Sequence, residues 1–388
     1  MSVVATPEAH VVHGMGVDQV EPDWPVLTGH EVSEVLRSYP EIDGDSQHNG
    51  LDASLLWLSP RPLSAAALVR TGSGSFFVKR HHATVRSAAS LAEEHAFLGH
   101  LRSNGAPVVR VLVDADGRSV HERGSWTYEV HTVGVGQDLY RDAISWSPFA
   151  ESSHARAAGQ ALARLHAAAS GFDAPHRAPA PLIAGFTVFA QEDPIAAVEQ
   201  YAAARPHVAA ELATRTQWRD DLTRHHLPFH ERLRPHLPQL EPLWVHGDFH
   251  ASNLLWQGDD VSSVIDFSLS DRSFAVHDLA TAIERNAVEW LALEEKGADA
   301  VHTEAALDLI RGYRQVRELS TAERAALPEL LPLCHVDYAL SEIDYFRRVT
   351  QSMENTELAY RYLVDHTAWF TTPAGNALLE RIRQVLGL

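Results

Sequence analysis

The sequence predicts an α+β fold in two unequal parts, and two observations carry this prediction. Short apolar runs separated by turn-forming residues fill residues 51–131 of the 388-residue chain, around a single helical pattern. After Gly134 and Gly136 the chain becomes rich in Ala and Leu with helical periodicity. We therefore expect a small strand-rich lobe and a larger helical lobe, with the glycine-bearing stretch between them acting as a hinge.

The small lobe is expected to span residues 26–132, after a loosely ordered extension over residues 1–25 with few periodic apolar positions. Thr28 and Glu31 form a capping box that starts a helix, and Pro40 ends it. A second helix is expected at residues 88–103. Strands of an antiparallel sheet are expected at residues 51–58, 65–70, 76–80, 108–114 and 125–131.

The large lobe, residues 133–388, is expected to consist mostly of helices. Its apolar positions recur with helical spacing, and Gly and Pro separate the periodic segments. The helical patterns cover residues 153–169, 194–204, 217–233, 277–293, 304–313, 321–345 and 357–370.

Composition narrows the possible partners. The chain has 32 Lys+Arg against 51 Asp+Glu, a formal net charge of −19, which argues against nucleic acid or an anionic membrane surface as the main partner. A small neutral or cationic ligand fits better. Only two of the basic residues are lysines, Lys79 and Lys296.

A cytoplasmic location is expected. The single cysteine, Cys334, excludes an internal disulfide, and the first residues lack the basic and apolar regions of a signal peptide. No apolar run reaches the ~18 residues of a membrane span.

The segment at residues 244–256 carries the clearest chemical signal. Apolar residues flank a polar centre that contains Gly247, Asp248 and, five residues further on, Asn253. A short apolar run then ends at Asp266, 18 residues after Asp248. Loops held by a rigid frame often carry catalytic groups, and two carboxylates with one amide supply the oxygen ligands that Mg²⁺ prefers.

This pattern resembles a known family. His246-Gly247-Asp248 with Asn253, then Ile265-Asp266-Phe267 and Asp278-Leu279-Ala280, resembles the catalytic and metal-binding loops of the aminoglycoside phosphotransferase and choline kinase superfamily, over residues 45–370. The layout after residue 312 resembles the homoserine-kinase-like branch. The resemblance implies a protein-kinase-like fold of two lobes and transfer of the γ-phosphoryl group of ATP to a hydroxyl group.

The resemblance also implies roles for residues of the small lobe. Lys79, on the third strand, would contact the α- and β-phosphates. Glu93 or Glu94 on the next helix would orient this lysine, and the spacing to the apolar positions favours Glu94. The end of the last strand would offer backbone groups to the nucleotide base, at Glu129, Val130 and His131.

In the large lobe, the resemblance implies that Asp248 is the catalytic base and that Asn253 and Asp266 hold Mg²⁺. His246 and Asp278 would brace the loop. ATP is the expected cosubstrate and GTP is possible. Two features depart from the family pattern: the loop at residues 59–64 has no glycine, and Ser268 replaces the usual glycine after Asp266-Phe267.

The acceptor implied by the resemblance is a small amino-bearing molecule, such as an amino alcohol, a hydroxy amino acid or an amino sugar. Four acids of the large lobe are candidates to contact it, although the same acids could face solvent on a helix: Asp271, Asp337, Glu342 and Asp344. A pseudokinase that binds nucleotide without turnover and a protein kinase remain alternatives. The helix expected at His277 begins only eleven positions after Asp266, which leaves little room for a peptide platform. The oligomeric state is not predicted.

Overall fold

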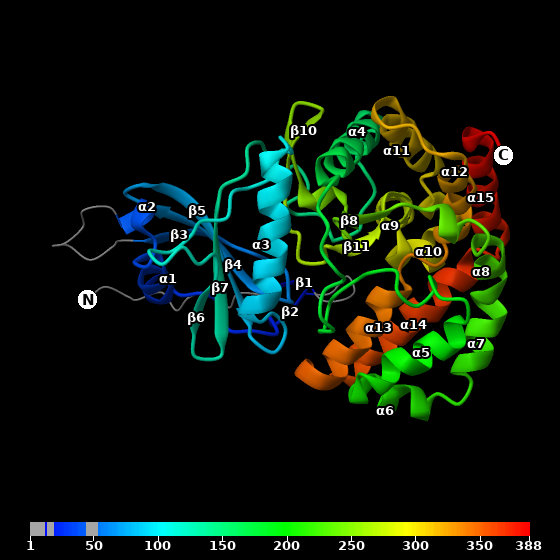
Figure 1. Cartoon of the computed structure of the whole chain (residues 1–388), viewed down its shortest axis with the longest axis horizontal. Coiled ribbons are helices and arrows are strands. Elements are labelled where there is room, and N and C mark those ends of the chain that lie inside the picture. The colour runs from blue at the N-terminus through cyan, green and yellow to red at the C-terminus, as the bar shows by residue number, and fades with distance from the viewer. Residues whose placement is uncertain (1–11, 14–18, 44–52) are drawn as a thin grey trace. The chain divides into compact units, whose positions relative to one another are not determined.

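The computed structural model describes residues 12–13, 19–43 and 53–388 (Figure 1). The chain divides into two compact units: unit 1 comprises Met1–Ala92 and Arg110–Val133, and unit 2 comprises Glu93–Val109 and Gly134–Leu388. Of the expected N-terminal extension, residues 1–11 and 14–18 lie outside the described residues. Within the described part, β1 (Val12–His13) pairs with β2 (Gln19–Val20).

Unit 1 is built on one antiparallel sheet of five strands, which confirms the predicted sheet. The first expected strand begins at residue 51, but residues 51 and 52 lie outside the described residues. Turn-forming residues separate neighbouring strands, as the sequence predicts. In spatial order the strands are β3 (Ser54–Leu58), β4 (Ala65–Thr71), β5 (Gly74–His82), β7 (Trp126–Thr132) and β6 (His121–Arg123).

Two short helices, α1 (Gly29–Leu36) and α2 (Pro40–Asp43), precede the sheet. The predicted capping box is confirmed: the Glu31 N–H donates to Thr28 Oγ1 at 3.2 Å, and the Glu31 side chain accepts from the Thr28 N–H. The apolar positions of α1 join the apolar core of the sheet. This packing fixes the helix on unit 1.

The prediction of a strand at residues 108–114 is wrong. In unit 1 this segment makes a single isolated bridge, between Val111 and His131, and β6 takes its place as the fifth strand. The Asp114 carboxylate accepts the backbone N–H groups of Asp116 and Arg118, each at 2.9 Å. These bonds close the turn that follows the expected strand. The segment itself forms no continuous ladder, because Val108 bridges to Val264 instead of to the sheet.

Unit 2 consists mostly of helices, as predicted. Helix α3 (Ala88–Ser103) begins in unit 1 and ends in unit 2. The other helices are α4 (Ser152–Ala169), α5 (Pro194–Ala203), α6 (Pro206–Thr214), α7 (Trp218–His225), α8 (Leu227–Leu233), α9 (Ala275–Ala287), α10 (Leu293–Lys296), α11 (Thr303–Val316), α12 (Thr321–Leu330), α13 (Val336–Tyr345), α14 (Met353–Trp369) and α15 (Pro373–Leu386).

Two long predicted helices are each divided in two. Residues 217–233 form α7 and α8, because Pro228 in the first turn of α8 suits a helix start rather than a helix interior. Residues 321–345 form α12 and α13 around Pro332, and a π-helical turn (Phe346–Thr350) follows α13. Helices α6 and α15 were not predicted.

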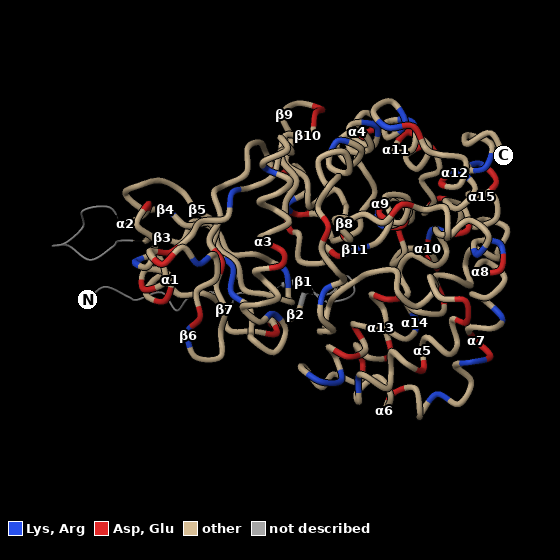
Figure 2. Tube along the Cα trace, viewed as in Figure 1, with Lys and Arg blue, Asp and Glu red and all other residues tan. Residues whose placement is uncertain are grey.

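Acidic and basic positions are interspersed around α6 and α7 (Figure 2).

Helix α9 lies at the centre of unit 2, and every residue from Ala275 to Ala287 is buried. Beside it, β8 (Pro242–Val245) pairs with β11 (Asp271–Phe274) (Figure 1). A second ladder joins β9 (Leu254–Gln257) to β10 (Asp260–Val264). None of the helices in the described part of the chain combines the length and apolar character needed to cross a bilayer.

Two glycines allow α4 and α11 to pack in close contact (Figure 1). A Cβ atom on Gly159 would lie 2.1 Å from the carbonyl oxygen of Leu309, and one on Gly312 would lie 2.0 Å from that of Arg156. Both obstacles are helix backbone, which cannot move aside as a flexible side chain would. The two helices therefore touch backbone to backbone at this crossing.

Gly159→Ala should destabilise the protein by about 1–3 kcal/mol, because the added methyl group forces the two helices apart. Gly99→Ala is the matched control: Gly99 is also inside a helix, but an added Cβ there meets no atom within 4 Å. This control should be neutral or stabilising by roughly 0.5–1 kcal/mol. Urea unfolding measures both, and equal effects of the two substitutions would contradict the close helix contact.

Candidate active site

The candidate site is built on two chain segments that leave the same end of the β8–β11 ladder. Val245 at the end of β8 pairs with Asp271 at the start of β11. The segment at residues 246–253 therefore runs beside the loop at residues 265–270. Gly247 adopts φ 78°, and a Cβ there would lie 2.4 Å from the carbonyl oxygen of Leu269. Only glycine fits this position, because it combines a left-handed backbone with a close approach.

Asp278 of α9 braces the start of this segment. Its Oδ2 accepts the His246 N–H and its Oδ1 accepts the Gly247 N–H, both at 2.9 Å. His166 Nε2 lies 3.0 Å from the same carboxylate. Burial by itself would raise the pKa of the Asp278 carboxyl, but the hydrogen bond and charge of His166 and the hydrogen bond from His246 lower it.

The His246 side chain connects the two loops. Its Nε2 lies 3.0 Å from the carbonyl oxygen of Ile265, and its Nδ1 accepts the Asp248 N–H at 3.2 Å. Asn286 of α9 adds a second brace, because its Oδ1 accepts the Ala251 N–H at 2.9 Å and its Nδ2 donates to the carbonyl oxygen of Phe249 at 3.2 Å. The sequence prediction did not include Asn286.

Asp248 and Asn253 lie together. Asn253 Nδ2 donates to the main-chain oxygen of Asp248 at 2.9 Å and lies 3.4 Å from Asp248 Oδ2. His250 Nε2 lies 3.3 Å from the same Oδ2. The Asp248 side chain is 18% exposed, so it can be reached from solvent.

Asp266 lies in the neighbouring loop. The N–H of Ile265 donates to the carbonyl oxygen of Asn253 at 3.0 Å, which ties this loop to the first. Asp266 is exposed and adopts a left-handed backbone with φ 59°, which is uncommon outside Gly, Asn and Asp. The structure thus brings all three predicted residues of the large lobe onto two adjoining loops.

Arg285 of α9 is a member of the site that the sequence prediction missed. Its Nε lies 2.8 Å from Asp248 Oδ1, and its side chain is only 1% exposed. Burial by itself would raise the pKa of Asp248, but the charges of His250 and Arg285 lower it, so this carboxylate is ionised at neutral pH. A signal was present in the sequence, because Glu284, Arg285 and Asn286 interrupt the apolar pattern of the helix expected at residues 277–293.

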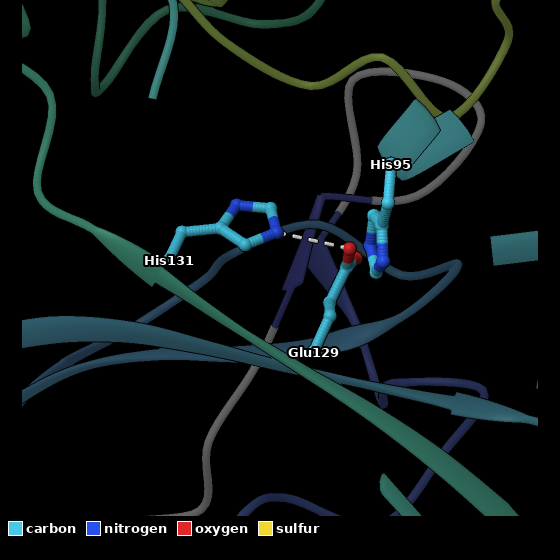
Figure 3. Close-up of side chains that lie close together, drawn as sticks. All are labelled: His95, Glu129 and His131. Atoms are coloured by element: carbon cyan, nitrogen blue, oxygen red, sulfur yellow. Dashed lines mark hydrogen bonds and ion pairs between the residues drawn. The ribbon is translucent and has the colours of Figure 1, made fainter. Parts of the chain in front are cut away.

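Unit 1 holds four of the other predicted residues: Lys79, Glu129, Val130 and His131. Lys79 on β5 pairs across the sheet with Glu129 on β7, and both side chains are buried. His131 Nε2 lies 3.0 Å from Glu129 Oε2, and Figure 3 shows the imidazole directed at this carboxylate. His81 Nε2 lies 2.9 Å from the other oxygen, Oε1. The carbonyl oxygen of Val130 accepts the Leu112 N–H at 2.8 Å, so this oxygen already has a hydrogen-bond donor within the protein.

Glu94 is buried in unit 2. Its Oε2 lies 3.7 Å from a terminal nitrogen of Arg177, and Glu93 lies 3.7 Å from Nε of the same arginine. Arg177 also donates to the carbonyl oxygens of Ser268 and Ser270, in the loop that follows Asp266. The helix that carries Glu94 is therefore connected to the second loop of the site. The pairing of Glu94 with Lys79 stays a prediction.

Two of the four acids that were candidates for acceptor contact have structural partners. Asp271 Oδ1 accepts the Arg177 N–H at 2.8 Å, and Asp337 Oδ2 accepts both the N–H and the hydroxyl of Thr187 at 2.6 Å.

Glu342 differs, because its buried Oε1 has no hydrogen-bond partner among the described residues. Burial raises the pKa of Glu342 to about 8, although Arg285 and Tyr338 act to lower it. A buried acid without full compensation is a candidate for contact with a ligand.

Asp278→Ala should lower the free energy of unfolding by roughly 3 kcal/mol or more, because it leaves two buried N–H groups without acceptors and each costs about 1–3 kcal/mol. Asp259→Ala is the control: its carboxylate is 72% exposed and 3.8 Å from His154, so the change should stay within about 0.5 kcal/mol.

At acidic pH, the free energies of unfolding of the parent and of Asp278→Ala should become more similar. The pKa of Asp278 is lower in the folded protein than in the unfolded chain, where it is about 3.9. The ionised carboxylate therefore stabilises the fold at pH values above about 3.9, and this stabilisation is lost as the pH falls through the folded pKa. Urea unfolding at several pH values measures this, and a difference independent of pH would contradict the assigned role.

Comparison with known proteins gives a family and a set of relatives. Residues 63–319 match the model of the phosphotransferase enzyme family. A homoserine kinase of Sinorhizobium fredii is 30% identical over 186 residues, which cover 48% of this chain and 49% of that one, so the chain spans about half the length of this relative.

Two solved structures show the same fold. An amicoumacin kinase in complex with AMP-PNP, Ca²⁺ and Ami has TM-score 0.56 and 17% identity, over 88% of this chain and 93% of that one. A microcompartment-associated aminopropanol kinase has TM-score 0.54 and 20% identity, over 92% and 98%. These likenesses confirm the predicted protein-kinase-like fold. The family match covers most of the chain, and by it this protein belongs to the phosphotransferase enzyme family.

Proposed function

We propose that this protein transfers the γ-phosphoryl group of ATP to a hydroxyl group of a small amino-bearing molecule, with assistance from Mg²⁺. One observation carries the proposal: Asp248, Asn253 and Asp266 lie on two adjoining loops that α9 and the β8–β11 ladder hold in place. Phosphoryl transfer depends on positioning and on charge neutralisation, and both need such a rigid arrangement.

Asp248 would act as the catalytic base and orient the acceptor hydroxyl. Its low pKa suits a carboxylate that orients the hydroxyl and accepts its proton late, when the phosphoryl group is already leaving ATP. The neighbouring His250 and Asn253 restrict the Oδ2 side of this carboxylate. The nucleophile would therefore meet a fixed acceptor atom.

Asn253 and Asp266 would hold Mg²⁺. An amide oxygen and an exposed carboxylate are hard oxygen donors of the kind this ion prefers. Asn253 uses its Nδ2 atom toward Asp248, which turns its amide oxygen away from that contact. When bound, the ion would neutralise charge on the phosphates.

Unit 1 would bind the nucleotide, with ATP as the expected cosubstrate and GTP as a possible one. Lys79 would contact the α- and β-phosphates, and Glu94 would orient it. The segment with Glu129, Val130 and His131 would lie along the base. Since the carbonyl oxygen of Val130 already accepts the Leu112 N–H, we expect the base to contact other groups of this segment.

Glu342 is the acid best suited to the amino group of the acceptor. Asp271 and Asp337 are occupied by backbone N–H groups, whereas Glu342 Oε1 has no partner among the described residues. An ammonium group placed there would stabilise the ionised form of this acid. Homoserine and aminopropanol, named in two of the similar proteins, each carry an amino group and a hydroxyl group.

A panel of acceptors tests the proposal. We expect ADP release with Mg²⁺ to depend on amino-bearing acceptors such as homoserine, 1-amino-2-propanol or an aminoglycoside. Asp248→Asn should lower kcat by about 10²-fold or more. A coupled assay with ATP and with GTP measures this. Turnover only with neutral polyols or with protein, or nucleotide binding without any turnover, would contradict the proposal.

Glu342→Gln should raise KM for the amino-bearing acceptor by about 10- to 100-fold, the worth of a charge-assisted hydrogen bond, and leave KM for ATP unchanged. In the parent, KM for the acceptor should fall as the pH rises toward about 8, where Glu342 ionises, and this trend should disappear in the variant.

Glu329→Gln is the matched control for Glu342→Gln. Glu329 is also a buried acid, but Arg232 and Arg383 occupy its two oxygens at 2.7 Å each. This substitution should change stability and not KM for the acceptor. Equal effects of the two substitutions on KM would exclude Glu342 as the contact.

A further inference from the structure

Arg285 is a buried arginine whose surroundings all serve to fix its guanidinium group. Its Nε lies 2.8 Å from Asp248 Oδ1, and its NH1 lies 3.5 Å from Glu284 Oε2 and donates to the hydroxyl of Tyr362 at 3.4 Å. Its Cζ lies 4.0 Å from the centre of the Trp146 ring. A planar guanidinium that is stacked on one face and paired at its edge has one orientation.

Trp146 stacks on Arg285 although its own backbone conformation is unfavourable. Its φ of 63° lies in the left-handed region, which a bulky side chain rarely adopts and which persists only where the surroundings enforce it. Its ring lies 5.5 Å from that of Tyr362 and 6.2 Å from that of Tyr338. The segment around Trp146 is therefore shaped to cover Arg285.

The far side of Arg285 is fixed as well. Glu284 Oε1 lies 2.9 Å from His366 Nδ1, and the His366 ring stacks on Trp290 with 3.7 Å between centres. Since Glu284 is anchored in this way, Arg285 cannot turn from Asp248 without losing contacts on both sides.

The pairing makes the two oxygens of Asp248 different. Oδ1 faces Arg285 and is shielded from solvent, although the side chain as a whole is 18% exposed. Oδ2 is the oxygen near His250 and Asn253. A carboxylate free to rotate would exchange its oxygens, whereas this one presents Oδ2 alone to an incoming hydroxyl.

We propose that Arg285 is a positioning residue for phosphoryl transfer: it holds Oδ1 of Asp248 so that Oδ2 meets the acceptor hydroxyl, and Trp146 keeps the guanidinium in place. This inference rests on the proposed role of Asp248. Misplacement of a catalytic group by about 1 Å costs about 10²-fold in rate, so the orientation of one carboxylate matters to turnover.

Arg285→Ala should lower kcat for the best acceptor of the panel by about 100-fold and leave KM for ATP within about threefold, because the nucleotide contacts are elsewhere. Millimolar guanidinium should restore kcat by about tenfold through the space left by the side chain, and ethylammonium should not. Arg285→Lys should stay impaired, since an ammonium group cannot reproduce the planar stack. Trp146→Ala should lower kcat by about tenfold without a change in KM for ATP.

Arg215→Ala is the matched control. Arg215 belongs to the same unit, pairs with Glu211 at 2.8 Å and stacks 4.4 Å from the ring centre of Tyr360, but it does not contact Asp248. Its substitution should leave kcat unchanged. Loss of kcat to the same extent in Arg215→Ala and Arg285→Ala, or kcat within threefold of the parent in folded Arg285→Ala and Arg285→Lys, would overturn the proposal.

A spectroscopic measurement detects the pair without turnover. In ¹H–¹⁵N spectra of the whole chain, the arginine Nε–H signal that is lost in Arg285→Lys should shift in Asp248→Asn. If the parent is active and its Arg285 Nε–H signal does not shift in Asp248→Asn, the proposed role of Arg285 is overturned and the proposed function is not. A parent that transfers no phosphate to any acceptor would overturn the proposed function itself, and with it this role.

Discussion

The candidate site depends on one buried carboxylate, that of Asp278. From a helix with no exposed residue, it accepts the N–H groups of His246 and Gly247 and contacts His166. The backbone of a loop has no sheet or helix partners of its own, so its buried N–H groups need acceptors from elsewhere. By supplying them, Asp278 fixes the point from which Asp248 and Asn253 follow.

Helix α9 extends this principle along its length. Asp278, Arg285 and Asn286 are polar or charged, and all contact the segment at residues 246–253. Burying such groups is unfavourable unless each finds a partner, so a helix of this composition is stable only beside that segment. The site and the core of unit 2 therefore stabilise each other, and the ionised Asp248 is matched by a guanidinium group that cannot move away.

Local sequence patterns and the spacing of polar residues predicted much of the fold and of the candidate site. The capping box at Thr28 is a local pattern, and it forms as predicted. The spacing of Asp248, Asn253 and Asp266 predicted their proximity because a single ladder, β8 with β11, places both loops at one end. The prediction of a strand at residues 108–114 failed because Val108 and Val111 bridge to different partners, Val264 and His131, which are distant in sequence. Arg285 was missed, and whether Glu342 faces solvent stayed open, for a related reason. The burial of a charged helical residue depends on partners that are distant in sequence, which for Arg285 are Trp146 and Tyr362.

The most direct test of this account is the chemical identity of the phosphorylated product. Incubation of the whole chain with MgATP and an amino-bearing acceptor, followed by ³¹P NMR, separates a phosphomonoester of the acceptor from inorganic phosphate. The account predicts a phosphomonoester on the acceptor hydroxyl, formed in equal amount to ADP and at least about 100-fold more slowly with Asp248→Asn. ADP formed with inorganic phosphate alone, or a phosphomonoester formed by Asp248→Asn at the rate of the parent, would contradict it.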